Sequence, residues 1–371
     1  MGDYGKVVTG NTPPTKDIEN YENGTYLWAS PADLGTIKSI TETKTMLSAQ
    51  GFSKTRTLPK GSVLVTCIGS TIGKAGMATK EMSTNQQINS IVVNDNNDNE
   101  FVYYAIQSAF PRYLSSIAVQ AVPIISKSAF ELLPNNRPYL QEQKKIGKFL
   151  SLLDERIATQ NKIIEDLKKL KSAIIEKHYG QAEKLIAYVA DLGESFSVGN
   201  LAKEDLTETG IPCVIYGELF TTYGETILQI ESHTNKTESM VLSKKGDLLF
   251  PSSTTVDAMS LIAPSVINVD GVILGGDMFG IHINHNYNAQ YLSYYFNHIA
   301  KRQLAKYAKG STIIHLHYTD IKKAKLSLPY LEEQNRMAKC LVILDDKIKV
   351  ENSLLNLLNS QKAYLLCQMF I

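Results

Sequence analysis

The chain has 371 residues, 43% of them hydrophobic, which is enough apolar material to bury two sizeable cores. Its formal net charge of +1 excludes a basic excess that would by itself attract nucleic acid or an anionic membrane. Four cysteines lie far apart without a CxxC pair, which favours free thiols in a reducing cytoplasm. No apolar run approaches the ~20 residues that span a bilayer, and no basic-then-apolar leader opens the sequence. We therefore expect a soluble, cytoplasmic, two-domain protein with no membrane partner.

The first part of the chain is predicted to form a β-rich domain. Alternation over residues 2–10 is typical of a strand, and Asn11-Thr12-Pro13-Pro14 breaks it as a loop. The only tryptophan, Trp28, is expected to anchor the core beside the Thr9-Gly10 loop. Further strands are expected at 26–30, 62–68 and 88–93, a Gly-rich turn at 69–76, and a helix within 101–118 from its three-to-four spacing of apolar residues.

A long amphipathic helix is predicted from Pro138 to about His178, with Gly180 as its C-terminal cap. Its apolar residues step alternately by four and three positions, as in a coiled-coil seam. The seam consists of Ile146, Leu150, Leu153, Ile157, Ile164 and Leu167, with Gln160 as a polar break.

The same helix occurs a second time. Pro138-Tyr139-Leu140-Gln141-Glu142-Gln143 returns 191 residues later (329 − 138) as Pro329-Tyr330-Leu331-Glu332-Glu333-Gln334. A period of that length is too long for a solenoid unit and indicates a duplicated domain with its helix. Gly2-Asp3 and Gly193-Glu194 have the same offset, and 211–218 parallels the Trp28 strand. The second seam consists of Met337, Leu341, Leu344, Ile348, Leu355 and Leu358, with Glu351 in the place of Gln160.

These repeats predict an α+β fold: two similar β-rich domains joined by two long antiparallel coiled-coil helices in a pseudo-two-fold arrangement. A polar residue in an apolar seam lowers stability but fixes register, so we expect the helices to pack on each other. The expected boundaries are 1–137 for the first domain, 138–180 for the first helix, 181–328 for the second domain and 329–371 for the second helix.

No catalytic, cofactor or metal site is predicted. Gly69-Ser70-Thr71-Ile72-Gly73-Lys74-Ala75 has one residue too few between its glycines for a phosphate loop, and Ala75 replaces the Ser or Thr that binds magnesium. His315 and His317 are expected on one side of a strand, without other ligands at metal-binding spacing. No methyl-donor turn or nuclease-type carboxylate pair is present. The chain is expected to bind and position a partner rather than transform it.

The paired Pro-Tyr-Leu-x-Glu-Gln helices and the repeated β-rich domains resemble the specificity (S) subunit of type I restriction-modification systems. Gly10 with Thr12-Pro13, the 28–34 stretch and Tyr216-Gly217-Glu218 are looser matches to the same family. The resemblance covers essentially the whole chain and implies that each domain reads one half of an asymmetric, bipartite double-stranded DNA site. It further implies that the helices set the spacer and dock two methyltransferase (M) subunits, and that a nuclease-translocase (R) subunit joins the assembly. Family members usually have residues before the first Gly-Asp segment and a tail after the last helix, so this chain is expected to be a short, clipped or rearranged member.

Arg and Lys recognise guanine, Asn and Gln recognise adenine, and Ser or Thr suits either, from loops near the groove. Such residues cluster in each domain, and we take them as candidates for DNA binding. Those of the first domain are Lys54, Arg56, Ser70, Thr71, Lys74, Asn85, Gln86 and Gln87. Those of the second are Ser252, Ser253, Thr254, Lys306, Lys309, Ser311, Thr312 and His315.

Three other interpretations stay open from the sequence. A coiled-coil adaptor or scaffold accounts for the helices but gives two elaborate domains no role. A single-chain modification enzyme is disfavoured by the missing motifs. A specificity subunit of a related system outside type I is the nearest rival, and neighbouring genes would separate it from the type I interpretation.

Overall fold

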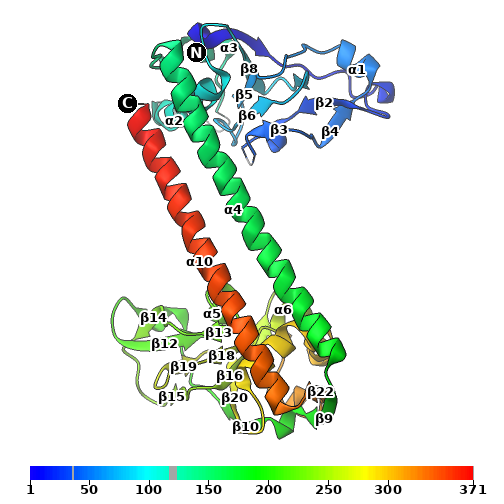
Figure 1. Cartoon of the computed structure of the whole chain (residues 1–371), viewed down its shortest axis with the longest axis vertical. Coiled ribbons are helices and arrows are strands. Elements are labelled where there is room, and N and C mark those ends of the chain that lie inside the picture. Colours follow the sequence, from blue (N-terminus) through cyan, green and yellow to red (C-terminus); the bar gives the residue numbers. More distant parts are fainter. Residues whose placement is uncertain (36, 117–122, 371) are drawn as a thin grey trace. The chain divides into compact units, whose positions relative to one another are not determined.

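A computed structural model describes residues 1–35, 37–116 and 123–370. The chain divides into a first unit (Met1–Lys162 with Ser353–Ile371) and a second unit (Ile163–Asn352). Two long helices, α4 (Leu140–Gln181) and α10 (Leu331–Met369), each contribute a segment to both units (Figure 1). Among the described residues, no helix combines the length and apolar character that a membrane crossing requires.

The first unit contains two sheets. Its larger sheet has the order β1-β8-β5-β6-β3, and its smaller sheet has the order β4-β2-β7. The larger sheet is built from β1 (Gly5–Thr9), β8 (Ile88–Val93), β5 (Val63–Thr66), β6 (Ala75–Ala78) and β3 (Ser39–Ile40). The smaller sheet is built from β4 (Thr45–Leu47), β2 (Tyr26–Ala29) and β7 (Ser83–Thr84). The strands predicted around Trp28, at 62–68 and at 88–93 are confirmed as β2, β5 and β8.

The second unit repeats the strand order of both sheets and extends the smaller one. Its main sheet, β10-β20-β16-β18-β13, has the antiparallel pairs and final parallel pair of the first unit's larger sheet. Its second sheet, β11-β14-β12-β19-β15, contains the counterpart of β4-β2-β7 and adds an edge strand on each side. The main sheet is built from β10 (Gly193–Ser197), β20 (Met278–Ile283), β16 (Asp247–Pro251), β18 (Ser265–Ile267) and β13 (Thr226–Ile227). The second sheet is built from β11 (Leu206–Thr207), β14 (Ser232–Thr234), β12 (Ile211–Ile215), β19 (Ile273–Gly275) and β15 (Val241–Leu242).

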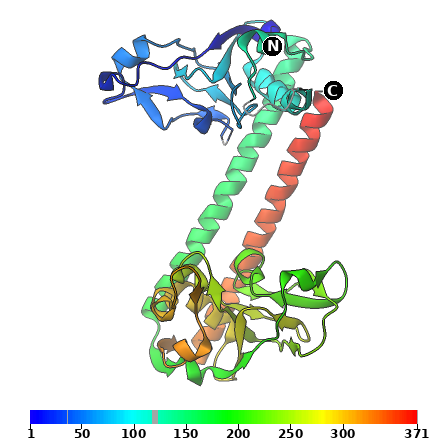
Figure 2. The same cartoon turned by 180° about the vertical axis from the view of Figure 1, so that it is seen from behind.

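Two short ribbons complete the strands of the second unit. Figure 1 labels the strands of one of them, and Figure 2 shows the same chain from behind. One ribbon pairs β17 (Ser253–Thr254) with β21 (Ile314–His315). The other pairs β22 (Lys325–Pro329) with β9 (Lys184–Tyr188). The second ribbon joins the end of α4 to the start of α10, because Lys184 pairs with Pro329.

Short helices cover the sheets. The first unit has α1 (Ala49–Ser53), α2 (Asn99–Ser116) and α3 (Lys127–Leu132). The second unit has α5 (Glu218–Thr221), α6 (Ala258–Leu261), α7 (Ala289–Tyr294), α8 (Lys301–Leu304) and α9 (Tyr318–Ile321). The helix predicted within 101–118 is confirmed as α2, although 117 and 118 lie outside the described residues. The cap predicted at Gly180 is wrong, because α4 continues to Gln181 before the chain enters β9.

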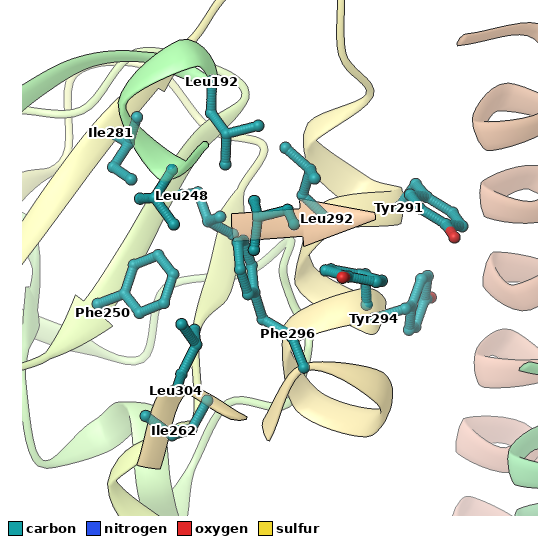
Figure 3. Packing of buried hydrophobic residues seen from close by; sticks show 14 of the residues in the cluster. Leu192, Leu248, Phe250, Ile262, Ile281, Tyr291, Leu292, Tyr294, Phe296 and Leu304 are labelled. Carbon is teal, nitrogen blue, oxygen red and sulfur yellow. The ribbon is translucent and has the colours of Figure 1, made fainter. Parts of the chain in front are cut away.

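Each unit has a hydrophobic core between its main sheet and the helices. In the second unit Leu248 and Phe250 of β16 meet Leu292 and Phe296, as Figure 3 shows. In the first unit Val63 and Val65 of β5 pack with Phe101 and Tyr104 of α2. Trp28 is buried with Leu47 and Phe52, and its indole Nε1 donates to the Asn11 carbonyl oxygen at 3.1 Å. The predicted place of Trp28 in the core is therefore confirmed.

The two long helices run antiparallel within each unit. In the first unit Asp154 of α4 meets Lys362 of α10. In the second unit Lys171 meets Asp345 and His178 meets Glu333, so the numbering rises along one helix as it falls along the other. The predicted α+β class, with two similar β-rich domains and two long antiparallel helices, is confirmed.

Every predicted seam residue is buried or half-buried. Ile146 and Leu150 belong to the core of the first unit, and Met337 and Leu341 belong to the core of the second. The start of each seam therefore anchors its helix in a domain as well as against the other helix. The polar break at Gln160 and Glu351 is also buried, and Glu351 forms an ion pair with Lys347 one turn earlier.

Candidate nucleic-acid interface

In the first unit, candidate residues gather around the Gly10–Thr12 loop. A Cβ atom at Gly10 would lie 2.2 Å from the Thr84 carbonyl oxygen, so only glycine lets this loop approach the end of β7 so closely. The Asn11 amide donates to the Lys54 carbonyl oxygen at 2.9 Å and accepts from the Arg56 N–H at 2.8 Å. These bonds hold the segment after α1 against the loop.

The basic side chains of this cluster are exposed but already have polar contacts. The Lys54 Nζ donates to the Asn20 side-chain oxygen at 2.9 Å and lies 3.7 Å from an Asp17 carboxylate oxygen. The Arg56 Nη1 donates to the Thr9 carbonyl oxygen at 2.8 Å. Since that contact uses one of the five guanidinium N–H donors, Arg56 keeps donors for a base edge or a phosphate.

The segment after β7 places its three amide side chains differently. The Asn85 side-chain oxygen accepts from the Gln87 N–H at 2.9 Å, and the Asn85 amide donates to the Gln87 side-chain oxygen at 3.1 Å. Asn85 is only 9% exposed, so its polar atoms shape the loop. Gln86 is exposed and bonds to Thr12, which places it over the Gly10–Thr12 loop.

The remaining candidates of the first unit lie on the turn from Gly69 to Gly73. The position of a Cβ on Gly69 is 3.8 Å from the Gln87 Nε2, so the turn carrying Ser70 and Thr71 runs beside the amide cluster. Lys74 packs instead against Gly35. The turn leads into strand β6, whereas a phosphate loop leads into a helix.

In the second unit the candidates meet on the β17–β21 ribbon. Ser253 pairs with His315, and the Leu316 N–H donates to the Ser252 carbonyl oxygen at 2.9 Å. Lys309 exchanges two backbone hydrogen bonds with His315, at 2.9 and 2.7 Å. Ser311 and Thr312 are exposed in the loop that this bridge closes, and Lys306 is exposed on a short 3-10 helix just before it.

Two polar side chains of this ribbon have acidic neighbours. The Lys309 Nζ lies 2.5 Å from an Asp320 carboxylate oxygen, and that hydrogen bond lowers the pKa of Asp320. The His315 Nδ1 lies 4.0 Å from an Asp277 carboxylate oxygen. A DNA phosphate near Lys309 would therefore compete with Asp320.

The expectation that His315 and His317 share one side of a strand is wrong. Strand β21 ends at His315, and His317 precedes α9, where its N–H donates to the Asp320 carboxylate at 3.0 Å. The two rings are stacked, with centroids 6.1 Å apart. Within the described residues, no group of three or more His, Cys, Asp and Glu side chains is placed to hold a metal ion.

A Tyr–Asp–Lys cluster joins the long helices to the domain in each unit. In the first unit the Tyr104 hydroxyl donates to Asp154 at 2.6 Å, and Lys362 lies 2.6 Å from the other Asp154 oxygen. Burial, reinforced by the hydrogen bond to Asp154, raises the pKa of Tyr104 well above its ordinary value. Tyr104 therefore stays a neutral donor.

The second unit has the same cluster with the helices exchanged. The Tyr294 hydroxyl donates to Asp345 at 2.5 Å, and Lys171 lies 2.6 Å from the other Asp345 oxygen. Lys171 also lies 3.0 Å from Glu225, which His298 contacts at 2.9 Å. Burial opposes ionisation of Glu225, yet His298 and Lys171 together lower its pKa to about 2.

The model of the type I restriction modification DNA specificity domain matches residues 1–169 and again 189–360. The chain belongs to this family. The two matches follow the internal repeat: the first ends within α4 and the second within α10, so each match contains one β-rich domain and most of one long helix.

Relatives and solved structures agree with the family. The type I restriction enzyme MjaVIII specificity subunit of Methanocaldococcus jannaschii is 26% identical over 306 residues, which are 76% of this chain and 70% of the relative. The HindI specificity subunit of Haemophilus influenzae is 28% identical over 180 residues, 46% of this chain and 38% of the relative. The type I S subunit from M. genitalium shares the fold, with a TM-score of 0.62, 17% identity and coverage of 99% of this chain and 93% of that one.

The Tyr–Asp–Lys clusters of this family member were missed by the sequence reasoning, although the sequence carried a signal for them. Asp154 and Asp345 are repeat partners, and Lys171 and Lys362 are separated by the same 191 residues (362 − 171). Charged residues beside the seam that recur at the domain period indicate a contact made once in each repeat. Only the fold shows that the lysine of one repeat meets the aspartate of the other.

Proposed function

We propose that this chain is the DNA specificity subunit of a type I restriction-modification complex, in which each recognition domain reads one half of an asymmetric bipartite site. The observation that carries the proposal is that the two units share one sheet topology but have different side chains in equivalent loops. Strand β5 leads toward Ser70 and Thr71, whereas its counterpart β16 leads to Ser252, Ser253 and Thr254. A shared scaffold with different polar loops suits two different half-sites.

The proposed recognition domains comprise 1–137 and 181–328, and their reading surfaces are the two candidate clusters. In the first cluster the exposed Arg56 and Gln86 would read base edges, while the buried Asn85 would hold the loop. In the second cluster Ser311 and Thr312 are the exposed polar groups at the end of the ribbon.

Methylome sequencing of a host that expresses this chain with its cognate M subunit tests the proposal. The expected motif has two different half-sites separated by unread bases. Arg56→Ala with Gln86→Ala should change only one half of the motif, and Ser311→Ala with Thr312→Ala only the other. A motif that neither pair alters, although both proteins fold and assemble, would contradict this assignment of the reading surfaces.

We propose that the long helices set the unread spacer. Four inserted residues lengthen a helix by about 6 Å, which corresponds to one or two base pairs. The insertion belongs after Asn161 and again after Asn352, which are repeat partners in α4 and α10. An unchanged spacer in the methylome of the folded, active variant would remove the ruler role.

We propose that α10 carries part of the dock for the M subunits. Ile343, Val350, Leu357 and Tyr364 recur at intervals of seven residues and are 60–67% exposed, an apolar stripe about six helical turns long that a helix of a partner could cover. Leu357→Glu should weaken co-purification with M at least tenfold, since a buried unpaired charge is costly. Asn356→Glu adds the same charge at the neighbouring exposed position and should assemble normally.

The net charge of +1 supports a division of labour in DNA binding. Few phosphate contacts give weak affinity and a shallow dependence on salt, so the M subunits are proposed to supply much of the affinity. An R subunit is proposed to join the same assembly, in line with a neighbour of the same fold whose structure concerns complex assembly of a type I system (TM-score 0.60, 15% identity). Tight, salt-insensitive binding of DNA by the chain alone would contradict this division.

We further propose that the chain performs no chemistry itself. The methyl donor would bind the M subunits and not this protein. Calorimetric titration of the isolated chain with S-adenosylmethionine should show no binding, and saturable binding would contradict the proposal.

A further inference from the structure

The end of the β17–β21 ribbon exposes two large apolar side chains. Val256 follows β17 and is 73% exposed, and Ile313 precedes β21 and is 50% exposed. Because Thr254 pairs with Ile314, the two residues lie at the same end of the ribbon. Both line one open cavity of about 690 Å³ in the second unit.

The backbone under these side chains is held in place. The Val256 N–H donates to the Thr254 Oγ1 at 3.2 Å. The next residue, Asp257, caps α6 by accepting from the Ser260 N–H at 2.7 Å. Val256 therefore projects from a fixed turn, and its exposure is a property of a structured loop.

The surroundings favour nucleic acid over an apolar protein partner. Thr254 and Thr255 line the same cavity, and Ser311 and Thr312 are exposed beside Ile313, so hydroxyl groups flank both apolar tips. Lys301 also lines the cavity, and Arg302 and Lys306 are exposed on the helical turns next to it. The one cavity carboxylate, Glu225, is already paired with Lys171 and His298. Apolar tips among hydroxyls and cations suit a major groove, where phosphates flank base edges.

We propose that Val256 and Ile313 read the 5-methyl group of thymine in the second half-site. This inference rests on the proposed DNA-reading function and adds a residue-level rule to it. The thymine methyl group is the apolar feature that a major-groove edge offers, and aliphatic side chains recognise it by contact. Neither residue belongs to the polar candidates, because neither side chain can donate or accept a hydrogen bond.

The test uses the chain assembled with its cognate M subunit and duplexes carrying the motif from the methylome. Deoxyuridine replaces thymidine at one position of the second half-site at a time, which removes the methyl group and keeps base pairing. Wild-type complex should bind at least one of these duplexes about fourfold more weakly, because a buried methyl group is worth about 0.8 kcal/mol. The effect of the same replacements in the first half-site on binding should not depend on Val256 or Ile313.

Val256→Thr and Ile313→Thr should reduce the difference between thymine and uracil at that position, because each threonine has less apolar surface but keeps one methyl group that can contact thymine. The valine change keeps side-chain shape and replaces a methyl group by a hydroxyl, and both sites are exposed, so the fold is retained. Leu242→Thr on the edge strand β15 is the matched control, since Leu242 is similarly exposed and lies outside the cavity. This control should discriminate as wild type does.

The possible outcomes distinguish a failure of the proposed methyl contact from a failure of the proposed DNA-reading function. Equal binding of every uracil-containing duplex, with specific binding of the unmodified motif intact, overturns the methyl contact alone. A second half-site without an A·T pair does the same. Loss of M-subunit assembly in Val256→Thr overturns it in favour of a protein dock. Absence of any sequence preference in the wild-type complex overturns the proposed function itself.

Discussion

Replacing Lys171 should show most clearly that the two units differ in stability. It is 7% exposed and faces two carboxylates, Glu225 at 3.0 Å and Asp345 at 2.6 Å. Among the carboxylates of the described residues, its repeat partner Lys362 forms an ion pair with Asp154 alone, and 22% of the Lys362 side chain is exposed. Lys171→Met and Lys362→Met therefore remove the same charge from matched sites of different burial.

The difference in burial sets the expected magnitudes. Removing one partner of a buried ion pair costs about 3–5 kcal/mol, because the other charge is left without compensation. We expect about 3 kcal/mol for Lys171→Met, since His298 still contacts Glu225. For Lys362→Met we expect about 1–2 kcal/mol, because water reaches the Asp154 site more easily. Lys177→Met, at an exposed position of the same helix, should stay within about 0.5 kcal/mol of wild type.

Hydrogen exchange measured by mass spectrometry resolves the units, which a single melting temperature does not. Lys171→Met should lower amide protection in β16 and β20 by about a hundredfold, the factor that corresponds to about 3 kcal/mol. Strands β5 and β8 should keep their protection in that variant. In Lys362→Met their protection should fall by about fivefold to thirtyfold, the factors that correspond to about 1–2 kcal/mol. Equal losses for Lys171→Met and the Lys177→Met control would refute the argument that this buried lysine neutralises two carboxylates.

Three further predictions concern single sites. The pKa of Glu225 falls from 4.5 to about 2 in the folded chain. Its ionised form therefore adds its full stability above pH 4.5, and this contribution is lost as the pH falls through about 2. The difference in hydrogen exchange between wild type and Glu225→Gln should vanish over that pH range. Gly10→Ala should destabilise the first unit by about 1–3 kcal/mol, because the new Cβ meets the Thr84 carbonyl, and urea denaturation followed by Trp28 fluorescence measures it. Ser126→Ala should cost about 1 kcal/mol in the same assay, because the Ser126 Oγ accepts from the first turn of α3; no shift in midpoint would contradict the capping role.

The long helices and the duplication could be predicted because their signals are local or recur at one fixed offset. Seam residues recur every three or four positions, which fixes both the element and its buried face. The 191-residue offset then transfers whatever is learned about one half to the other. The predicted helix ends were less accurate, as Gly180 shows. This glycine lies inside α4, which ends at Gln181, shortly before β9 pairs with β22.

The sequence indicated which candidate residues could lie together, but not which of their polar atoms are accessible. Ser253 and His315 pair across 62 residues (315 − 253), a contact that no local pattern reveals. Asn85 looked like a base reader by residue type, yet its amide holds the loop. Val256 and Ile313 were passed over because exposed apolar residues look like core residues in a sequence.

The two Tyr–Asp–Lys clusters constrain how the spacer can change. Each long helix carries the aspartate of one cluster and the lysine of the other, 17 residues apart in α4 (171 − 154) and 17 residues apart in α10 (362 − 345). Because a helix rises about 1.5 Å per residue, the equal intervals give the two helices equal lengths between their charged residues. An insertion in α4 alone makes the intervals unequal by about 6 Å, and one pair must then break or one helix must bend. We therefore expect single-helix insertions to lose protection near one cluster, whereas matched insertions after Asn161 and Asn352 keep both pairs and alter only the spacer.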